Sequence, residues 1–507
     1  MPKRAATLPL ALPPREPGTP AHRWLYGALR TEILEGRLRP GTRLPATRDL
    51  AVQHALSRGT VVSAFEQLKA EGYVEGSVGS GTYVTRVLPE ELLHASRPAR
   101  GRAASQRCGR RPLSALAQRA RLFPAYDARP TRAFRANLPA LDLFPTTLWA
   151  QLAARRVRGA TTRLLMGCDP MGWRPLRDAV AGYLTTARGV ACAPEQVAIV
   201  SGVQEALDIA ARLLLDPGDT VCMEDPGYPG AALAFEACGA RVRTAPPDDA
   251  GLRLDAPFLR GARLAYVTPA HQFPLGIAMP LSRRLALLEW ARGAGAMIFE
   301  DDYDSEYRYA GRPLPALQGL DRDGVVLFAG SFSKVLFPSL RLGYLVVPPD
   351  LVDPIAALKS LTSRHAPLLE QAVLHDFIVE GHFARHVRRM REVYAERLAV
   401  LLECGRECLT GLLEITGVEA GLQTAGWLAG GIAEDEAVAA AAARDVDVTP
   451  LGEYGRSAGA RAGLQLGFAA VDAPEIRRGA RELAAALEPL ARARRNITRA
   501  SRSPRTP

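Results

Sequence analysis

The fold of this chain is indicated most directly by the stretch Ser331-Phe332-Ser333-Lys334-Val335-Leu336-Phe337-Pro338-Ser339-Leu340-Arg341. It follows the β-rich run Val325 to Ala329, so its lysine lies just beyond the carboxyl end of an expected strand. Ligands of open α/β sheets bind beyond such ends. A lysine between two serines, seven residues before an arginine, can form a Schiff base with an aldehyde while Ser331, Ser333 and Arg341 hold an attached phosphate.

The same alternation of strands and helices continues on both sides of this stretch. Short β-rich runs alternate with helical segments from Val197 onward, which favours a mainly parallel sheet with helices on both faces. The expected strands are Val197 to Val200, Thr220 to Met223, Arg241 to Thr244, Leu264 to Val267, Ala296 to Phe299, Val325 to Ala329 and Leu342 to Val347. The sequence therefore predicts an α/β domain.

A second contact with the phosphate is expected after the first of these strands. The backbone amides of Gly202 and Val203, followed by Gln204, open a predicted helix there. A helix N-terminus carries unpaired N–H groups and a partial positive charge, and both favour a phosphate. We therefore expect the phosphate to lie between this turn and the serines around Lys334.

Two other strand ends carry residues that suit an aromatic ring. Asp301 would keep a pyridinium nitrogen protonated, and Tyr303 could form a hydrogen bond with a phenolic oxygen. Tyr228 would stack on the ring itself. The cofactor that these residues describe is pyridoxal 5′-phosphate, with Lys334 as its Schiff-base lysine.

This part of the chain resembles the fold-type I aminotransferases, which implies a large pyridoxal phosphate-dependent domain that forms a homodimer. Two stretches, Glu300 to Tyr309 and Thr268 to Pro274, resemble more narrowly the MocR type of GntR regulator. The resemblance also brings out a departure. Gln465 stands where catalytic aminotransferases have the arginine that binds the substrate carboxylate, and Arg461 is the nearest arginine before it.

The first hundred residues predict a separate small domain. Leu25, Leu29 and Ile33 form the apolar stripe of one amphipathic helix, and a second helix is expected from about Thr47 to His54. Ser57 caps a third helix, and two short strands joined by a glycine-rich turn follow it. A helix, a turn, a second helix and a glycine-tipped hairpin are typical of domains that place a recognition helix in the major groove of DNA.

These residues resemble the winged helix-turn-helix domain of the GntR family along its whole length, including Glu35 to Pro45 and Ser57-Arg58-x-Thr60-Val61. The resemblance implies double-stranded operator DNA as a partner. The candidate DNA-binding residues are Arg48, Ser57, Arg58, Thr60 and Gly81. A three-helix interaction module is the alternative for this segment.

Charge and composition divide the chain into five parts. The formal net charge is +11, and residues 87–133 hold ten arginines against three acidic residues. This excess suits a polyanionic partner, and it equally suits a solvated basic tether. We expect an N-terminal arm, a winged helix-turn-helix, a flexible basic linker, an aminotransferase-like domain and an Arg/Ser-rich tail. Their predicted bounds are 1–20, 21–86, 87–133, 134–490 and 491–507.

Several classes of protein are disfavoured. The seven cysteines are scattered without a Cys-x-x-Cys pair, which disfavours a disulfide framework and a zinc site and suits a reducing cytoplasm. His382 and His386 have the spacing of helical metal ligands but lie among arginines, so we expect no metal. No run of 18 apolar residues occurs, so we expect no membrane partner.

The sequence thus predicts a cytoplasmic transcription regulator that binds DNA and senses pyridoxal phosphate, a small amine or an amino acid. The alternative is a working aminotransferase with an accessory DNA-binding arm. Lys334, Asp301 and Tyr303 favour the alternative, and Gln465 opposes it. Catalysis, the effector, the operator and the sign of regulation are therefore left open. The linker, treated as a coil, spans roughly 35 to 40 Å, which is long enough to allow a domain-swapped dimer.

Overall fold

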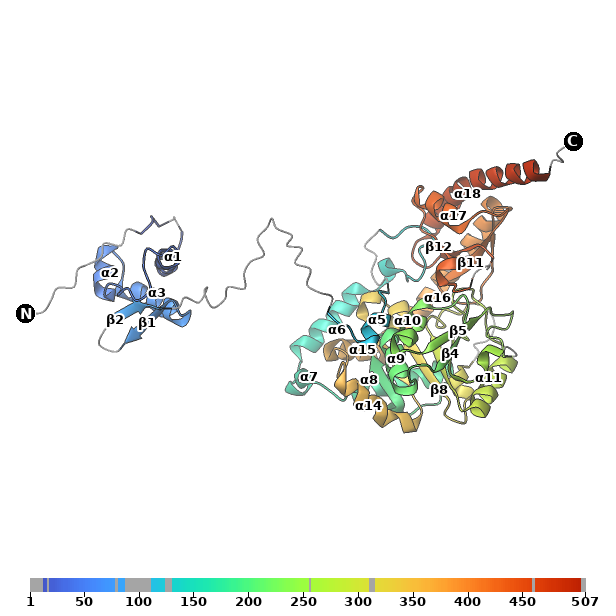
Figure 1. Cartoon of the computed structure of the whole chain (residues 1–507), viewed down its shortest axis with the longest axis horizontal. Helices are drawn as coiled ribbons and strands as arrows, with labels where there is room; N and C mark the ends of the chain where they lie inside the picture. Colours follow the sequence, from blue (N-terminus) through green and yellow to red (C-terminus); the bar gives the residue numbers. More distant parts are fainter. Residues whose placement is uncertain are drawn as a thin grey trace, which may run out of the picture. The chain divides into compact units, whose positions relative to one another are not determined.

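The computed structural model describes residues 12–15, 18–77, 81–86, 111–123, 130–254, 257–309, 315–457 and 461–502. The chain forms two compact units, Met1–Arg111 and Pro112–Pro507, whose helices and strands are labelled in Figure 1. This division separates the segment expected to bind DNA from the segment expected to bind a cofactor.

The N-terminal unit consists of three helices and a hairpin. Its elements are α1 (Ala21–Leu34), α2 (Thr47–Gln53), α3 (Arg58–Ala70), β1 (Val74–Ser77) and β2 (Gly81–Val84), and the two strands pair antiparallel. Leu25, Leu29 and Ile33 of α1 share one buried core with Val61 and Leu68 of α3, as the apolar stripe of α1 predicts. The predicted helix-turn-helix and hairpin are confirmed, and the turn at residues 78–80 lies outside the described residues.

The large unit is built on a seven-stranded sheet with the order β3-β9-β8-β7-β6-β4-β5. Its strands are β3 (Val197–Val200), β4 (Thr220–Glu224), β5 (Arg241–Ala245), β6 (Ala262–Val267), β7 (Met297–Asp302), β8 (Val326–Ser331) and β9 (Gly343–Val346). Only β9 runs antiparallel to its neighbours, so the sheet is mainly parallel, as predicted. Strand β7 ends at Asp302, beyond the predicted end at Phe299, so Asp301 belongs to the strand itself.

Helices cover both faces of this sheet. Successive side chains of a strand point to opposite faces, and on β3 the pair Ala198 and Val200 packs with α9 and α10 whereas Val197 and Ile199 pack with α8. The helices of the unit are α5 (Ala115–Arg119), α6 (Thr146–Arg158), α7 (Thr162–Met166), α8 (Arg174–Arg188), α9 (Val203–Leu214), α10 (Pro229–Cys238), α11 (Leu281–Ala294), α12 (Leu317–Leu320), α13 (Phe332–Val335), α14 (Val352–Leu361), α15 (Leu368–Val379), α16 (His382–Cys408), α17 (Glu434–Ala442) and α18 (Ala473–Arg502).

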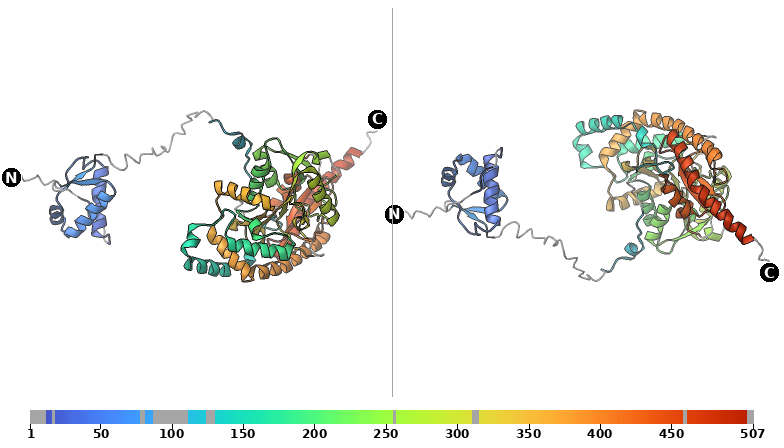
Figure 2. Two further views of the ribbon diagram at one scale, coloured as in Figure 1. Left: turned by 90° about the horizontal axis from the view of Figure 1, so that it is seen from below. Right: turned by 90° about the horizontal axis from the view of Figure 1, so that it is seen from above.

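A four-stranded antiparallel sheet, which was not predicted from the sequence, follows in the C-terminal part. Its order is β10-β11-β13-β12, and its strands are β10 (Leu413–Ile415), β11 (Gln423–Leu428), β12 (Thr449–Pro450) and β13 (Gly463–Gly467). Helices α16 and α18 lie side by side next to it, as Figure 2 shows. Phe134 bridges to Gly467, where an added Cβ would lie 2.0 Å from the carbonyl oxygen of Arg135. A glycine at this position therefore lets the segment around residue 135 cross the end of β13.

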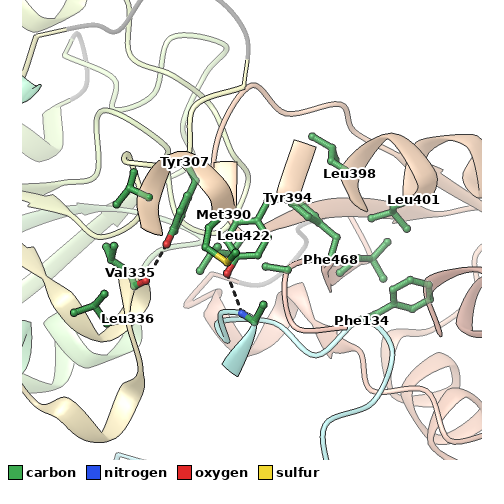
Figure 3. Packing of buried hydrophobic residues seen from close by; sticks show 14 of the residues in the cluster. Phe134, Tyr307, Val335, Leu336, Met390, Tyr394, Leu398, Leu401, Leu422 and Phe468 are labelled. Carbon is green, nitrogen blue, oxygen red and sulfur yellow. Dashed lines mark hydrogen bonds between the residues drawn. The ribbon is translucent and has the colours of Figure 1, made fainter. Parts of the chain in front are cut away.

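Two buried tyrosines fix the backbone on which the site is built. Tyr307 donates a hydrogen bond to the carbonyl oxygen of Val335 at 2.9 Å, and Tyr394 accepts one from the N–H of Ala140 at 2.9 Å (Figure 3). Their ring centroids lie 4.9 Å apart in an edge-to-face pair. The backbone next to Lys334 and the segment after residue 137 are thereby held by one hydrophobic core.

The structure corrects the expected linker. Residues 87–110 and 124–129 lie outside the described residues, but the short helix α5, which lies within the predicted linker, belongs to the large unit and contacts α10. Nε of Arg119 donates to the carbonyl oxygen of Ala237 at 3.1 Å. The end of the predicted linker is therefore packed on the large unit and is not a free tether.

The predicted tail also needs correction. Helix α18 continues to Arg502, through the expected boundary at residue 490, and Ala491 is only 3% exposed. The first part of the predicted tail is therefore the last part of a packed helix. None of the helices in the described ranges is both long enough and apolar enough to cross a membrane.

Candidate functional site

Lys334 lies in α13, just beyond the carboxyl end of β8. Its Nζ donates to the backbone carbonyl oxygen of Asn137 at 2.7 Å. Burial lowers the pKa of Lys334 to about 8, although the negative charges of Asp304 and Asp301 oppose this effect. At such a pKa about a tenth of the amine is neutral at pH 7, far more than for an ordinary lysine, and the neutral amine is the form that attacks a carbonyl carbon.

The strand register brings the predicted phosphate-binding residues together. Val200 of β3 and Ser331 of β8 both pair with Gly343 of β9, so the turns that follow these two strands meet at one edge of the sheet. An added Cβ at Gly343 would lie 2.7 Å from the carbonyl oxygen of Gly330 and 3.3 Å from Cα of Gly202. Glycine at position 343 therefore permits this close approach.

Hydrogen bonds and one unpaired hydroxyl mark this meeting point. Nη2 of Arg341 donates to the carbonyl oxygen of Ser201 at 2.8 Å, and Gly202 is the N-cap of α9. Oγ of Ser331 accepts from the N–H of Ser333 at 3.2 Å. The Oγ atom of Ser333 is buried without a partner among the described residues. An arginine, a helix N-terminus and a free hydroxyl form a site suited to an anion.

Asp301 presents an unpaired carboxylate oxygen. Its Oδ2 accepts from the hydroxyl of Tyr266 at 2.7 Å, whereas its Oδ1 is buried with no partner in the described part of the chain. Burial raises the pKa of Asp301 to about 7, and the hydrogen bond from Tyr266 opposes the rise. A ligand with a protonated nitrogen would pair with Oδ1 and would favour the charged carboxylate.

Aromatic side chains pack against one another near Asp301. The ring centroids of Tyr228 and Phe273 lie 5.9 Å apart, and those of Phe273 and Tyr303 lie 5.8 Å apart. The hydroxyl of Tyr303 lies 2.9 Å from Nδ1 of His271. His271 was not predicted to belong to the site, although it lies in the sequence motif Thr268 to Pro274, which could have revealed it.

The remaining predicted residue, Gln204, lies next to Tyr228. Its Nε2 donates to the carbonyl oxygen of Gly230 at 2.9 Å, and its Oε1 lies 3.4 Å from the Tyr228 hydroxyl. Phe123, which was assigned to the linker, packs edge to face against Tyr228, with ring centroids 5.8 Å apart. Sequence periodicity gave no signal for this contact.

The candidate DNA-binding residues lie at the starts of α2 and α3 and on the hairpin. Arg48 and Arg58 are exposed in the first turns of these helices. Ser57 is the N-cap of α3, and its Oγ accepts from the N–H of Thr60 at 3.1 Å, so the predicted cap is confirmed. Thr60 is half-buried rather than fully exposed. Gly81 begins β2 with a φ of +111°, a backbone conformation that favours glycine.

The two histidines with metal-ligand spacing make other contacts. Nε2 of His382 lies 3.3 Å from Glu380, and Nε2 of His386 lies 3.2 Å from the carbonyl oxygen of Val335. Within the described ranges, no three side chains of the types that bind metals form a cluster.

Comparisons with known proteins identify both units. Residues 22–84 match the bacterial regulatory proteins of the gntR family, and residues 137–483 match the aminotransferases of class I and II. The chain is 41% identical over 473 residues to the probable rhizopine catabolism regulatory protein MocR of Rhizobium meliloti, which covers 93% of this chain and 94% of that protein. It is 31% identical to the pyridoxine biosynthesis transcriptional regulator PdxR of Corynebacterium glutamicum, over 93% of this chain and 97% of that relative.

The large unit also resembles a solved enzyme. The α-aminoadipate aminotransferase of Thermus thermophilus, complexed with N-(5′-phosphopyridoxyl)-L-leucine, matches it with a TM-score of 0.66 and 32% identity, over 71% of this chain and 92% of that chain. The large unit thus has the aminotransferase fold, and the small unit has the winged helix of the gntR family. The chain therefore belongs to the MocR type of GntR transcription regulators, in which a winged helix-turn-helix precedes an aminotransferase-like domain.

Proposed function

We propose that this regulator holds pyridoxal phosphate at Lys334, and that occupancy of the site by the cofactor, a small amine or an amino acid changes its affinity for operator DNA. The observation that carries the proposal is the presence of a winged helix-turn-helix and a half-buried lysine site in one chain. Regulation by a small molecule requires two such sites and an energetic link between them.

The cofactor suits the polar atoms that the site leaves unpaired. Oδ1 of Asp301 and Oγ of Ser333 are buried without partners among the described residues. A buried polar atom is costly unless a ligand pairs with it. The protonated ring nitrogen of pyridoxal phosphate would pair with Asp301, and its phosphate would accept a hydrogen bond from Ser333.

Each of the other predicted residues has a role in holding this group. Arg341, Ser331 and the amides of Gly202 and Val203 would bind the phosphate. Tyr228, held by Gln204, would stack on the ring, and Tyr303 would contact its phenolic oxygen while remaining next to His271. When bound at Lys334, the cofactor supplies a carbon that reacts reversibly with primary amines and a ring that withdraws electrons.

We assign DNA contact to the exposed starts of α2 and α3. Arg58 would reach base edges in the major groove, and Arg48 would contact a phosphate. Ser57 and Thr60 would hold and extend the N-terminus of α3, and Gly81 would allow the hairpin to approach the backbone. A cytoplasmic homodimer would present two such units to a palindromic operator.

The packed end of the linker offers a route from the cofactor site toward the DNA-binding unit. Phe123 contacts Tyr228, and Arg119 ties α5 to α10. A ligand that moves Tyr228 would change this contact and so change how the segment leading to the N-terminal unit is anchored. Coupling between two sites requires a difference of this kind between two states of the protein.

A working aminotransferase is the second candidate. In its favour, Lys334 and Asp301 lie in one site with Tyr303. A 2-aminoadipate transaminase of Thermus thermophilus is also 33% identical to this chain over 364 residues, which cover 70% of this chain and 90% of that enzyme. Gln465 argues against it, because a neutral amide orients an α-carboxylate poorly for proton transfer.

One titration separates the two candidates. Primary amines and amino acids are added to the cofactor-loaded protein while operator affinity and keto or aldehyde product are followed together. A regulator should change its operator affinity at ligand concentrations that yield negligible product. Rapid multiple turnover with constant operator affinity would favour the enzyme.

A further inference from the structure

Lys334 contacts Asn137, whose side chain forms hydrogen bonds to the neutral amides of Gln423 and Gln465. We call these three residues the amide cluster. The carbonyl oxygen of Asn137 accepts from Nζ of Lys334 at 2.7 Å, so the cluster lies directly beside the reactive amine. Gln423 is 1% exposed and Gln465 is completely buried. A ligand that reaches Lys334 from this side therefore meets amide groups instead of water.

A backbone N–H fixes the orientation of all three amides. The N–H of Asn137 can only donate, and it faces Oε1 of Gln423 at 2.7 Å. Nε2 of Gln423 therefore faces Oδ1 of Asn137, at 3.2 Å. The other arm of Asn137, Nδ2, then faces Oε1 of Gln465 at 3.4 Å. The hydroxyl of Tyr454 donates to the same oxygen at 2.7 Å. The amide group of Gln465 that these contacts leave unpaired is therefore Nε2.

The Nε2 group of Gln465 is a buried donor that needs an acceptor. Nε2 of Gln465 has no partner among the residues that the structure describes. The strand register holds the residue in place, because Gln465 of β13 pairs with Ala425 of β11 on one side and with Thr449 of β12 on the other. A ligand oxygen would satisfy the donor and would remove the cost of leaving it unpaired.

The three cationic residues singled out for this region, Lys334, Arg341 and Arg461, have other partners. Lys334 and Arg341 serve the cofactor in the proposed function. Arg461, four residues before Gln465, instead pairs with Glu414 at 2.7 Å and lies over the ring of Trp427. A carboxylate buried beside neutral amides would lack the partner that offsets its loss of hydration.

We infer that the ligand of this site is a primary amine that carries an uncharged oxygen, such as a hydroxyl, in place of the carboxylate of an amino acid. The inference rests on the proposed function, because an amine-reactive cofactor at Lys334 makes the ligand an amine. Gln465 is then the specificity residue, and its Nε2 donates to the hydroxyl oxygen. A site with a buried hydrogen-bonding group discriminates strongly against ligands that cannot pair with it.

The test compares two molecules of matched size, 2-amino-1-propanol and alanine, which differ only in a hydroxymethyl or a carboxylate group. Both are titrated into the cofactor-loaded full-length protein, and binding is followed by calorimetry and by the visible spectrum. The wild type should bind the amino alcohol at least about tenfold more tightly. Equal or tighter binding of alanine by the loaded protein would overturn the inference, whereas absence of a cofactor on Lys334 would overturn the proposed function.

Three variants show whether Gln465 sets this preference. Gln465→Met roughly keeps the volume and removes the whole amide, including the donor Nε2, so it should weaken binding of the amino alcohol about tenfold and leave binding of alanine unchanged. Gln465→Arg should reverse the preference toward alanine. Arg461→Gln, on the exposed side of the same segment, should have no effect. An unchanged preference in Gln465→Met would contradict the inference, even if the arginine variant fails to fold.

Discussion

The two units of the chain present their candidate functional groups in opposite ways. In the N-terminal unit Arg48 and Arg58 are exposed at helix starts, whereas in the large unit Asp301, Ser333 and Gln465 are buried with one polar atom unpaired. DNA is a long polyanion, so a protein binds it with basic side chains that are exposed to solvent. A small molecule enters a pocket, so its site is marked by interior atoms that lack partners. Exposed positive charge therefore indicates the DNA-binding site, and buried polar atoms without hydrogen-bond partners indicate the small-molecule site.

The largest expected effect is the loss of the covalent cofactor when the buried amine is removed. Wild-type protein loaded with pyridoxal phosphate should show visible absorbance, and borohydride should fix the group to the peptide that contains Lys334. Lys334→Ala should lose both signals completely. Lys69→Ala, in the other unit, should keep both. Visible absorbance that survives in Lys334→Ala would refute the assignment.

The next effect concerns the exposed site. Arg58→Ala should weaken specific operator binding by about ten- to a hundredfold if the guanidinium contacts a base, and Arg48→Ala should reduce the salt dependence as the loss of one phosphate contact does. Lys69→Ala removes the same charge from the last turn of α3 and serves as the control. Binding isotherms at several salt concentrations measure the operator affinity and its salt dependence. If affinity and salt slope in both arginine variants equal those of the wild type, the groove assignment is wrong.

A smaller effect is expected where the linker packs on the cofactor site. Phe123→Ala removes the ring that contacts Tyr228. Cofactor binding and operator binding should persist, but the change in operator affinity that the ligand causes should fall about fivefold or more. Leu122→Ala is the matched control, because Leu122 is 93% exposed. Operator affinity measured with and without ligand gives the coupling. A full response in Phe123→Ala would place the coupling elsewhere.

The smallest expected effect is a shift in the pH dependence of cofactor capture by Lys334. Only the neutral amine of Lys334 attacks an aldehyde, and burial lowers the pKa of Lys334 to about 8. The rate at which cofactor-free protein captures pyridoxal phosphate should therefore rise with pH, with its midpoint near pH 8, and level off at higher pH. In Asp301→Asn the nearby negative charge is lost, so the plateau should begin at a lower pH. A rate that keeps rising toward the ordinary lysine pKa of about 10.4 would show that the amine is not buried.

Sequence patterns predicted those parts of the molecule that depend on local order. The seven strands of the large sheet were visible as short β-rich runs, and Lys334 stood out because it follows one of them. The cap formed by Ser57 was visible because capping requires only neighbouring residues. The turns after β3 and β8 meet, as expected, because parallel strands bring their carboxyl ends to one edge.

Contacts between distant segments could not be predicted in this way. Asn137 bonds to Lys334 across 197 residues and to Gln465 across 328, and nothing near Asn137 marks it as a site residue. The segment that contains α5 was interpreted as a tether because it is rich in Arg, Ala, Ser and Pro and lacks sustained apolar periodicity. The structure shows that α5 indeed buries none of its side chains. It is held by one arginine and a backbone carbonyl, a contact that leaves no hydrophobic pattern in the sequence.

The central claim is that occupancy of the lysine site controls operator binding. The most direct test measures the operator affinity of wild-type protein and of Lys334→Ala at increasing concentrations of pyridoxal phosphate, followed by 2-amino-1-propanol. The account predicts a change of about fivefold or more in the wild type and no change in Lys334→Ala. An equal change in both proteins, or no change in a wild type whose cofactor is covalently attached, would contradict it.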